Sequence, residues 1–285
     1  MNIATDHSSI SGWLEAYCVF LDNSKTNRDD SYHTSSLNNI DTEEDTPSLP
    51  CLVSLSPNLD SGKKVNACPD SGCTMSLISE NFANKMGVRI LRTPIKLYGS
   101  TGANIELVGQ AIIFVKVELV SVKRLRVLVV KKNTDDLTIS YRDLITLRVL
   151  AANFPNKVTD KEAPLMQHPN SDCNEAPYLN CRVQAGTTID VSCKAVPDSG
   201  CTGLTRISKH FVKQCGIKVY PTSFKSIHSK VSGQAWISIK IKNQIKINRL
   251  VLVANITDDM LLSWRDLIDL GVLPHDFPSP APESI

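Results

Sequence analysis

The alternation of apolar and polar residues along the chain predicts β-strands in two separate stretches. Runs in which β-branched residues recur at every second position are typical of strands with one buried face. In the first stretch these runs are residues 51–55, 65–68, 111–119 and 125–130, and in the second they are 236–242 and 245–253. Both stretches are therefore predicted to be mostly β-structure.

Each stretch also contains a short segment with helical spacing that ends at a glycine. Residues 79–86 precede Gly87, and residues 208–215 precede Gly216. Glycine is the usual residue at the left-handed end of a helix, because it has no side chain to clash there. Two short helices in equivalent places are therefore predicted.

A second helix is predicted near the end of each stretch. Ser140-x-x-Asp143 and Ser263-x-x-Asp266 match the capping-box pattern, in which the serine caps the helix and the acid satisfies amides of its first turn. Apolar residues then recur at helical spacing, at Leu144, Leu147 and Leu150 and at Leu267, Leu270 and Leu273.

These matching elements belong to an internal repeat. Asp70-Ser71-Gly72-Cys73-Thr74 recurs as Asp198-Ser199-Gly200-Cys201-Thr202, residues 108–111 correspond to 232–235, and residues 137–145 correspond to 260–268. The spacing between matched segments changes by only a few residues along the chain, as small loop insertions would cause. Two homologous lobes of roughly a hundred residues each are therefore expected, whereas a solenoid would need three or more short repeats.

The repeat and the composition around it define the domain boundaries. We expect a leader over residues 1–47, lobe 1 over 48–156, a linker over 157–180, lobe 2 over 181–279 and a tail over 280–285. The leader is rich in Ser, Asn, Asp and Thr and is predicted to be largely disordered, with a docking helix as the alternative. The apolar stripe behind that alternative is Ile10, Trp13, Leu14, Tyr17, Cys18 and Leu21.

Composition narrows the functional classes. The 285 residues are 42% hydrophobic, which is enough to give each lobe a core, and the net charge of +2 gives no indication of a nucleic-acid partner. No apolar run is long enough for a transmembrane helix, and the N-terminus lacks the basic and apolar regions of a signal peptide. We therefore expect a cytoplasmic protein without a membrane partner.

The cysteines and histidines show neither a metal-binding nor a disulfide pattern. The nine cysteines include no C-x-x-C pair, so we expect reduced core thiols at Cys68, Cys73, Cys193 and Cys201. A redox switch at Cys73 and Cys201 is the alternative. The histidines without metal-ligand spacing are His168, His210 and His228, and neither a metal nor a cofactor is expected.

The repeated Asp-Ser-Gly turn carries the candidate chemistry. Glycine allows a sharp turn and leaves room above the carboxylate. Two such turns brought face to face would set Asp70 and Asp198 side by side, and the pair would share one proton because like charges at close range cannot both ionise. The ionised member would then take a proton from a water molecule, while the protonated member would polarise a scissile carbonyl without a covalent intermediate. Such a pair titrates as a unit.

The motifs together resemble the retropepsin domain of Ty3/gypsy-type LTR retrotransposons. The likeness includes Asp-Ser-Gly-Cys-Thr, the helix after it, and the final Leu-Leu-Ser-Trp-Arg-Asp-Leu-Ile-Asp-Leu-Gly-Val-Leu with its trailing Phe-Pro. It covers residues 50–156 and 181–278. The resemblance implies a mostly β fold of two tandem closed β-barrel lobes of the acid-protease type, each with a short C-terminal helix, which form a pseudo-dimer. It also implies an aspartic endopeptidase that cleaves between apolar residues.

The resemblance assigns roles to the repeated turns. Asp70 and Asp198 would be the catalytic pair, while Ser71 and Ser199 would make hydrogen bonds between the lobes. Gly72 and Gly200 would face the substrate backbone. The turns would be supported further by Thr74 and Thr202.

The sequence departs from the family in three places. The family carries a glycine before the last helix, where this chain has Ser140 and Ser263, and a serine N-cap explains that change. A flap over the substrate is expected at residues 97–108, with its tip at Gly99, Ser100, Thr101 and Gly102, whereas residues 224–232 of lobe 2 are shorter and lack an internal glycine. The third residue after each aspartate is a cysteine, a weaker donor than the serine of pepsins, so we expect a less acidic pH optimum.

Three alternatives stay open at this level. The chain is an active endopeptidase that acts on a peptide or polyprotein, or it is an inactive retroelement remnant that binds peptides or is purely structural. In the third arrangement the lobes pair between chains and form a homodimer. The linker is long enough for pairing within one chain.

Overall fold

The computed structural model describes residues 47–118, 120–132, 135–155, 176–224, 230–241 and 245–279. Both lobes belong to one compact unit, Asp41–Ile285. Nearly all of the leader, including the alternative docking helix, most of the linker and the centre of the expected lobe 2 flap lie outside the described residues. No helix among the described residues is long and apolar enough to cross a membrane.

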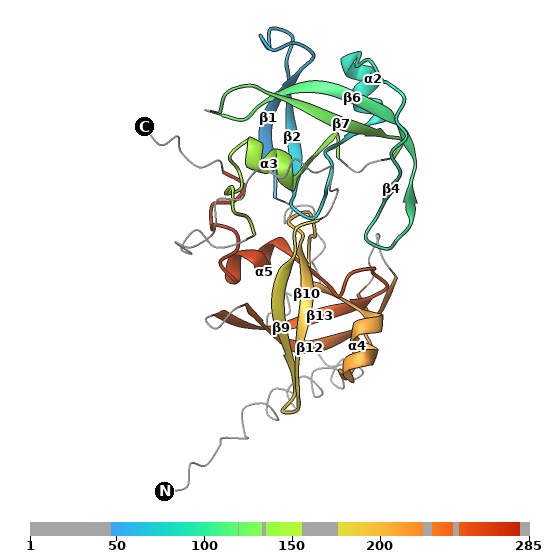
Figure 1. The fold of residues 1–285 in the computed structure, drawn as a ribbon, viewed down its shortest axis with the longest axis vertical. Helices are drawn as coiled ribbons and strands as arrows, with labels where there is room; N and C mark the ends of the chain where they lie inside the picture. Colours follow the sequence, from blue (N-terminus) through green and yellow to red (C-terminus); the bar gives the residue numbers. More distant parts are fainter. Residues whose placement is uncertain are drawn as a thin grey trace, which may run out of the picture. The chain divides into compact units, whose positions relative to one another are not determined.

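Lobe 1 is a closed barrel of six strands, in the order β1-β2-β8-β3-β7-β6. It is coloured blue to green in Figure 1, and two short helices and a hairpin accompany it. The barrel strands are β1 (Leu49–Ser54), β2 (Lys63–Asp70), β3 (Leu77–Ser79), β6 (Leu107–Lys116), β7 (Lys123–Val130) and β8 (Leu137–Ser140). The hairpin is β4 (Leu97–Tyr98) with β5 (Asn104–Ile105), and the helices are α2 (Glu80–Met86) and α3 (Tyr141–Thr146).

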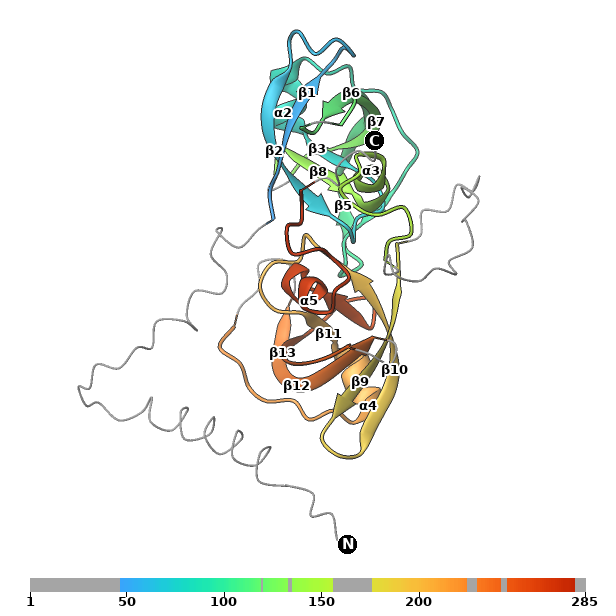
Figure 2. The same ribbon diagram turned by 90° about the vertical axis from the view of Figure 1, so that its left-hand side faces the viewer.

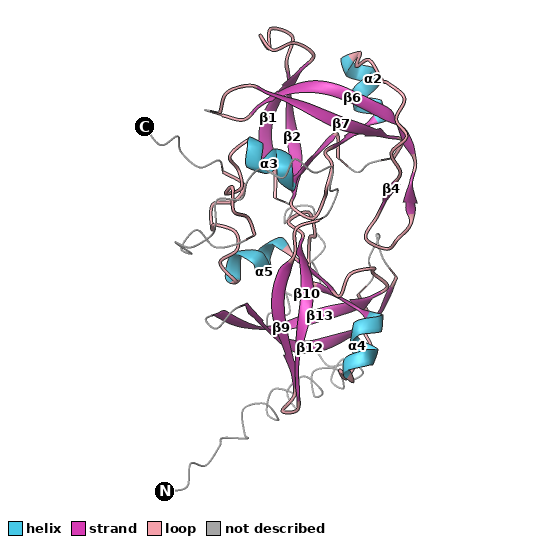
Figure 3. Ribbon diagram, viewed as in Figure 1, coloured by secondary structure: helices cyan, strands magenta, loops and turns pink. Residues whose placement is uncertain are grey.

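Lobe 2 is a second closed barrel whose six strands follow the same cyclic order, β10-β14-β11-β13-β12-β9. Figure 2 shows this barrel in yellow to red, with α5 near β11 and β13. Its strands are β9 (Leu179–Ala185), β10 (Ile189–Pro197), β11 (Arg206–Ser208), β12 (Val231–Ile241), β13 (Ile245–Ala254) and β14 (Met260–Leu262), and its helices are α4 (Lys209–Cys215) and α5 (Trp264–Asp269). Strands dominate both lobes (Figure 3), so the predicted mostly β fold with two closed barrels is confirmed.

The period-two pattern places every second side chain of a strand in a barrel core. In β6, Ala111, Ile113 and Val115 are buried. Their cross-strand partners Val127 and Leu125 of β7, opposite Ala111 and Ile113, are buried too. The strands therefore form because the alternating apolar positions can be removed from water on one face of the sheet.

A parallel pair of strands positions the repeated turn in each lobe. β2 runs parallel to β8, with Asp70 opposite Ser140. In lobe 2, β10 runs parallel to β14, with Pro197 opposite Leu262. Since parallel strands end at the same edge, the turn after the first strand and the helix after the second begin side by side.

The helices that follow the turns begin and end where the sequence predicts. Ser79 caps α2, because its hydroxyl accepts from the backbone N–H of Phe82, and Gly87 ends the helix with a φ of 70°. In lobe 2, Ser208 caps α4 in the same way, and Gly216 ends it with a φ of 68°. A left-handed φ of this kind costs glycine little.

The final helices are shorter than predicted, and one of the two predicted caps is wrong. α3 and α5 span six residues each. The Ser263 hydroxyl accepts from the backbone N–H of Asp266, as expected. Ser140 makes no side-chain cap, because its hydroxyl lies 3.3 Å from the Asp143 carboxylate and its own N–H donates to Ser76. Four leucines predicted on the helices lie after them and are still buried, at Leu147, Leu150, Leu270 and Leu273.

A glycine at a bulge lets another segment approach the long strand of each barrel. The register of β6 shifts at Gly109, and that of β12 shifts at Gly233. Next to Gly109, Gln110 exchanges two backbone hydrogen bonds with Leu91, at 2.8 Å each. A Cβ atom at Gly109 would overlap the carbonyl oxygen of Leu91, and one at Gly233 would overlap the side chain of Val219.

We predict that Gly109→Ala and Gly233→Ala each lower the free energy of unfolding by about 1–3 kcal/mol, because the added methyl forces a close backbone contact apart. Urea denaturation measures the effect. Gly99→Ala is the matched control, since its Cβ would meet its nearest atoms only at 3.9 Å. Unfolding midpoints that match the wild type in the first two variants would contradict this packing.

Candidate active site

The aspartate of each repeated turn lies directly at the end of a strand. Asp70 is the last residue of β2, and Asp198 follows the last residue of β10. One carboxylate oxygen of Asp70 accepts from the backbone N–H groups of Gly72, at 2.9 Å, and Cys73, at 3.0 Å. These bonds hold the carboxyl group of Asp70 within its own turn.

Four hydrogen bonds between the lobes join the two turns. The Ser71 hydroxyl donates to the Pro197 carbonyl at 2.6 Å and accepts from the Ser199 N–H at 3.0 Å. The Ser199 hydroxyl donates to the Pro69 carbonyl at 2.6 Å and accepts from the Ser71 N–H at 2.9 Å. Both serines are fully buried, so the described lobes are joined within one chain by a symmetric set of bonds in a water-free environment.

The two carboxyl groups meet across this junction. Asp70 and Asp198 lie close enough for each carboxyl group to act on the pKa of the other. A Cβ atom at Gly72 would lie 3.0 Å from the Asp198 carboxyl carbon, and one at Gly200 would lie 2.9 Å from that of Asp70. Glycine therefore suits each turn, because a Cβ atom there would crowd the aspartate of the other lobe.

The pKa values of the two carboxyl groups are shifted by different neighbours. Burial raises the pKa of both above the ordinary range, and the charge of Asp198 raises the pKa of Asp70 further. The positive charge of Arg206 opposes the rise in the pKa of Asp198. Burial therefore disfavours ionisation of both carboxyl groups, and the pair titrates as a unit.

The thiols beside the pair stay protonated. Burial raises the pKa of Cys73 and raises that of Cys201 to about 12. The Cys73 thiol donates to the Met75 carbonyl at 2.9 Å. Because the thiolate is the reactive form, these two side chains are poor redox sites. The seven cysteines of the described part are all free.

The hairpin of lobe 1 holds the predicted flap residues at its turn. Gly99, Ser100, Thr101 and Gly102 connect β4 to β5, and Gly102 has a φ of 76°. The Ser100 carbonyl accepts from the N–H of Thr257, at 2.9 Å, and from its hydroxyl, at 3.0 Å. The hairpin tip of lobe 1 is therefore tied to a loop of lobe 2. The corresponding residues 225–229 of lobe 2 lie outside the described part.

The polar support of the turns comes from residues that sequence reasoning missed. Thr74 and Thr202, the predicted support residues, are half-buried in the turns. The fully buried hydroxyls of Ser76 and Thr205 donate instead to the carboxylates of Asp143 and Asp266. The aspartate that the capping pattern assigns to a helix amide thus ties the final helix to the loop that carries the Asp-Ser-Gly motif.

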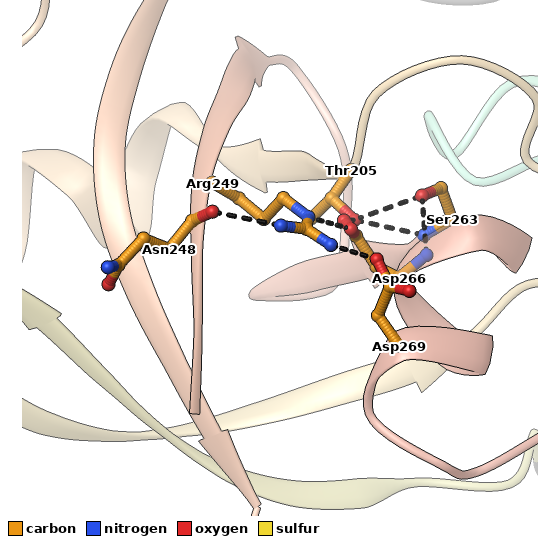
Figure 4. Close-up of polar contacts among 6 residues, drawn as sticks. All are labelled: Thr205, Asn248, Arg249, Ser263, Asp266 and Asp269. Carbon is orange, nitrogen blue, oxygen red and sulfur yellow. Dashed lines mark hydrogen bonds and ion pairs between the residues drawn. The ribbon is translucent and has the colours of Figure 1, made fainter. Parts of the chain in front are cut away.

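Lobe 2 extends this support with an arginine (Figure 4). Arg249 of β13 pairs with Asp266 through Nε and with Asp269 through a terminal nitrogen. The Thr205 hydroxyl also accepts from the backbone N–H of Ser263 at 3.0 Å. Asp266 is 5% exposed, and a buried carboxylate of this kind needs its charge paired.

Two comparisons with known proteins find no match, and the third finds solved structures. No family model and no curated protein matches the chain. The chain is similar to the retroviral protease-like domain of Ddi1 from Leishmania major, with 18% identity over 35% of this chain and 74% of that one and a TM-score of 0.25. It is also similar to the EIAV protease in complex with the inhibitor HBY-793, with 16% identity over 41% of this chain and 92% of that one and a TM-score of 0.28.

We predict that Ser71→Ala and Ser199→Ala each lower the free energy of unfolding by about 2–4 kcal/mol, because each leaves a buried carbonyl and a buried N–H of the other lobe unsatisfied. The symmetry of the junction implies similar losses for the two variants. Chemical denaturation measures them, with Ser192→Ala, an exposed serine of β10, as the control. Losses no larger than that of the control would show that the lobes do not pair through these turns.

Proposed function

We propose that this chain is an aspartic endopeptidase in which each lobe supplies one carboxyl group to a single catalytic pair. The observation that supports it most directly is the contact between Asp70 and Asp198, whose turns are joined by the hydrogen bonds of Ser71 and Ser199. Two carboxyl groups with one shared proton are the groups that water activation and carbonyl polarisation require.

The reaction follows from the proton arrangement. The Asp198 carboxylate takes a proton from a water molecule as its oxygen attacks the scissile carbonyl carbon, and Asp70 gives its proton to the carbonyl oxygen. In the tetrahedral intermediate, Asp198 then passes its proton to the leaving nitrogen, the C–N bond breaks, and Asp70 recovers a proton as the carbonyl reforms. The pair ends in its starting state, and no covalent enzyme intermediate forms.

The substrate we propose is a peptide or polyprotein with apolar residues at the cleavage site. In lobe 1 an apolar cluster of Leu77, Leu128 and Val130 packs against Cys73 of the catalytic turn and Leu97 of the hairpin. An apolar substrate side chain would gain by burial against such a surface. The Thr257 contact at the hairpin tip is consistent with a flap that closes over the peptide.

We further propose that the two lobes descend from tandem copies of a Ty3/gypsy-type retropepsin unit. The repeated Asp-Ser-Gly-Cys-Thr motif supports this origin. So does the common cyclic strand order of the two barrels. If the lobes have this origin, each has kept the one catalytic carboxyl group that each subunit of a homodimeric enzyme supplies.

Cleavage of a quenched library of apolar peptides tests the function. We predict that Asp70→Asn and Asp198→Asn each reduce kcat/KM by at least about a hundredfold, the usual contribution of a positioned acid or base. Asp60→Asn, at an exposed loop aspartate, should leave the rate unchanged. A wild type that is silent from acidic to neutral pH would contradict the proposal and favour an inactive remnant.

The raised pKa values predict the dependence on pH. Burial raises the pKa of both carboxyl groups above the ordinary range of Asp, and the cysteine three residues after each aspartate is a weaker hydrogen-bond donor to the ionised form than the serine of pepsins, whose pair titrates at about 1.5 and 4.7. The optimum of kcat/KM should therefore be less acidic than that of pepsin. A maximum at about pH 2, between those two values, would contradict it.

The raised pKa of Asp70 also predicts how the stability of the fold depends on pH. A carboxyl group whose folded-state pKa is raised contributes stability below its unfolded pKa, and this contribution is lost as the pH rises through the folded value. Asparagine cannot ionise, so Asp70→Asn avoids the loss of stability that ionisation of Asp70 causes. At neutral pH the variant should therefore unfold at a higher urea concentration than the wild type. The difference should shrink as the pH falls below about 4, the ordinary pKa of Asp.

A further inference from the structure

The two lobes differ at one position that flanks the catalytic turns. β3 begins at Leu77, which lies opposite Leu128 and Thr138. β11 begins at Arg206, which lies opposite Leu252 and Leu261. Since the two strands hold the same place in barrels of the same cyclic order, Arg206 stands in lobe 2 where lobe 1 has a leucine.

The surroundings of Leu77 are apolar throughout. Leu77 is 9% exposed and forms a cluster with Leu128 and Val130. Partly buried apolar side chains from the catalytic turn and from the hairpin pack against this cluster, namely Cys73, Met75, Ile95, Leu97, Ile105 and Leu107. The lobe 1 side of the pair is therefore suited to an apolar substrate side chain.

Arg206 has hydrogen-bonding capacity that the described residues leave unused. Its Nε is buried and has no hydrogen-bond partner among the described residues. The residue as a whole is half-buried, so part of it remains accessible. Its charge acts on Asp198 and on Cys201 and opposes the rise that burial causes in the pKa of both.

A buried N–H donor without a hydrogen-bond partner is costly even when an anion such as Asp198 lies nearby, so Nε of Arg206 calls for an acceptor. The nearby residues opposite Arg206, Leu252 and Leu261, are buried and apolar in their side chains. A ligand is therefore the natural source of the acceptor. Guanidinium matches a carboxylate in shape and charge.

We propose that Arg206 binds a carboxylate side chain of the substrate, so that the protein selects a Glu or Asp residue on the lobe 2 side of the scissile bond and an apolar residue on the lobe 1 side. This inference rests on the proposed peptidase function. An endopeptidase substrate presents side-chain carboxylates near its cleavage site, and these are the anions that a buried guanidinium would select. The two halves of the substrate site thus differ in chemistry although the two barrels share one fold.

Paired peptides that differ only by Glu or Gln at one position test the selection. At about pH 6 the Glu side chain is ionised, and a hydrogen bond to a charged group should raise kcat/KM for the Glu peptide by about tenfold or more. The preference should appear on one side of the scissile bond only. Arg206→Leu, which installs the lobe 1 residue, should bring the Glu/Gln ratio to about one, while Arg206→Lys should keep part of it.

Arg182→Leu is the matched control, because Arg182 lies on the exposed face of β9 and pairs there with Asp190; its Glu/Gln ratio should equal that of the wild type. A wild-type ratio of about one, or a ratio that survives in Arg206→Leu, would overturn the proposal. A changed pH profile with an unchanged ratio would also overturn it, since Arg206 would then act only on Asp198.

A measurement of peptide affinity tests this inference independently of the proposed peptidase activity. The same Glu and Gln peptides with a reduced, uncleavable scissile bond can be titrated by fluorescence anisotropy. A tenfold preference for Glu that disappears in Arg206→Leu would support the carboxylate site even if no peptide is cleaved. Equal affinity for the two peptides, or no binding of either, would overturn the site.

Discussion

The reciprocal bonds of Ser71 and Ser199 are the constraint on which the rest of the site depends. Each serine hydroxyl donates to a proline carbonyl of the other lobe and accepts the N–H of the other serine. Because both serines are fully buried, no water can replace a lost partner, and the turns have one permitted separation. That separation brings the Asp70 and Asp198 carboxyl groups into contact and leaves little room for a Cβ atom at Gly72.

A shared fold does not make the two halves of the site equal. A homodimer would have the same groups on both sides of its carboxyl pair, whereas one chain with two lobes is free to change each side alone. Here Leu77 in one lobe is matched by Arg206 in the other, and only the first lobe has a described hairpin, tied to Thr257. The charge of the arginine opposes the rise in the pKa of Asp198, and in our proposal the arginine also selects the substrate.

The sequence was sufficient to predict the elements whose causes are local. The alternating strands and the helix end at Gly87 depend on neighbours within a few residues, and the structure contains them as expected. The predicted cap at Ser140 was wrong because the Ser140 hydroxyl donates to the Asp143 carboxylate, while its N–H donates to Ser76, which is far away in the sequence. The loop before Arg206 is one residue longer than the loop before Leu77, but the predicted helices that follow already align the two residues, and the strand register agrees with that alignment.

The most direct test of the account is a mixing experiment with the two inactive variants Asp70→Asn and Asp198→Asn. If each chain builds its own pair, the two variants refolded together should show no more activity than they show separately. If instead the pair is formed between chains, half of the dimers would be mixed and each would hold one intact pair, which would restore about a quarter of the wild-type activity. Such a recovery would contradict the central claim that the two lobes of a single chain form the catalytic pair.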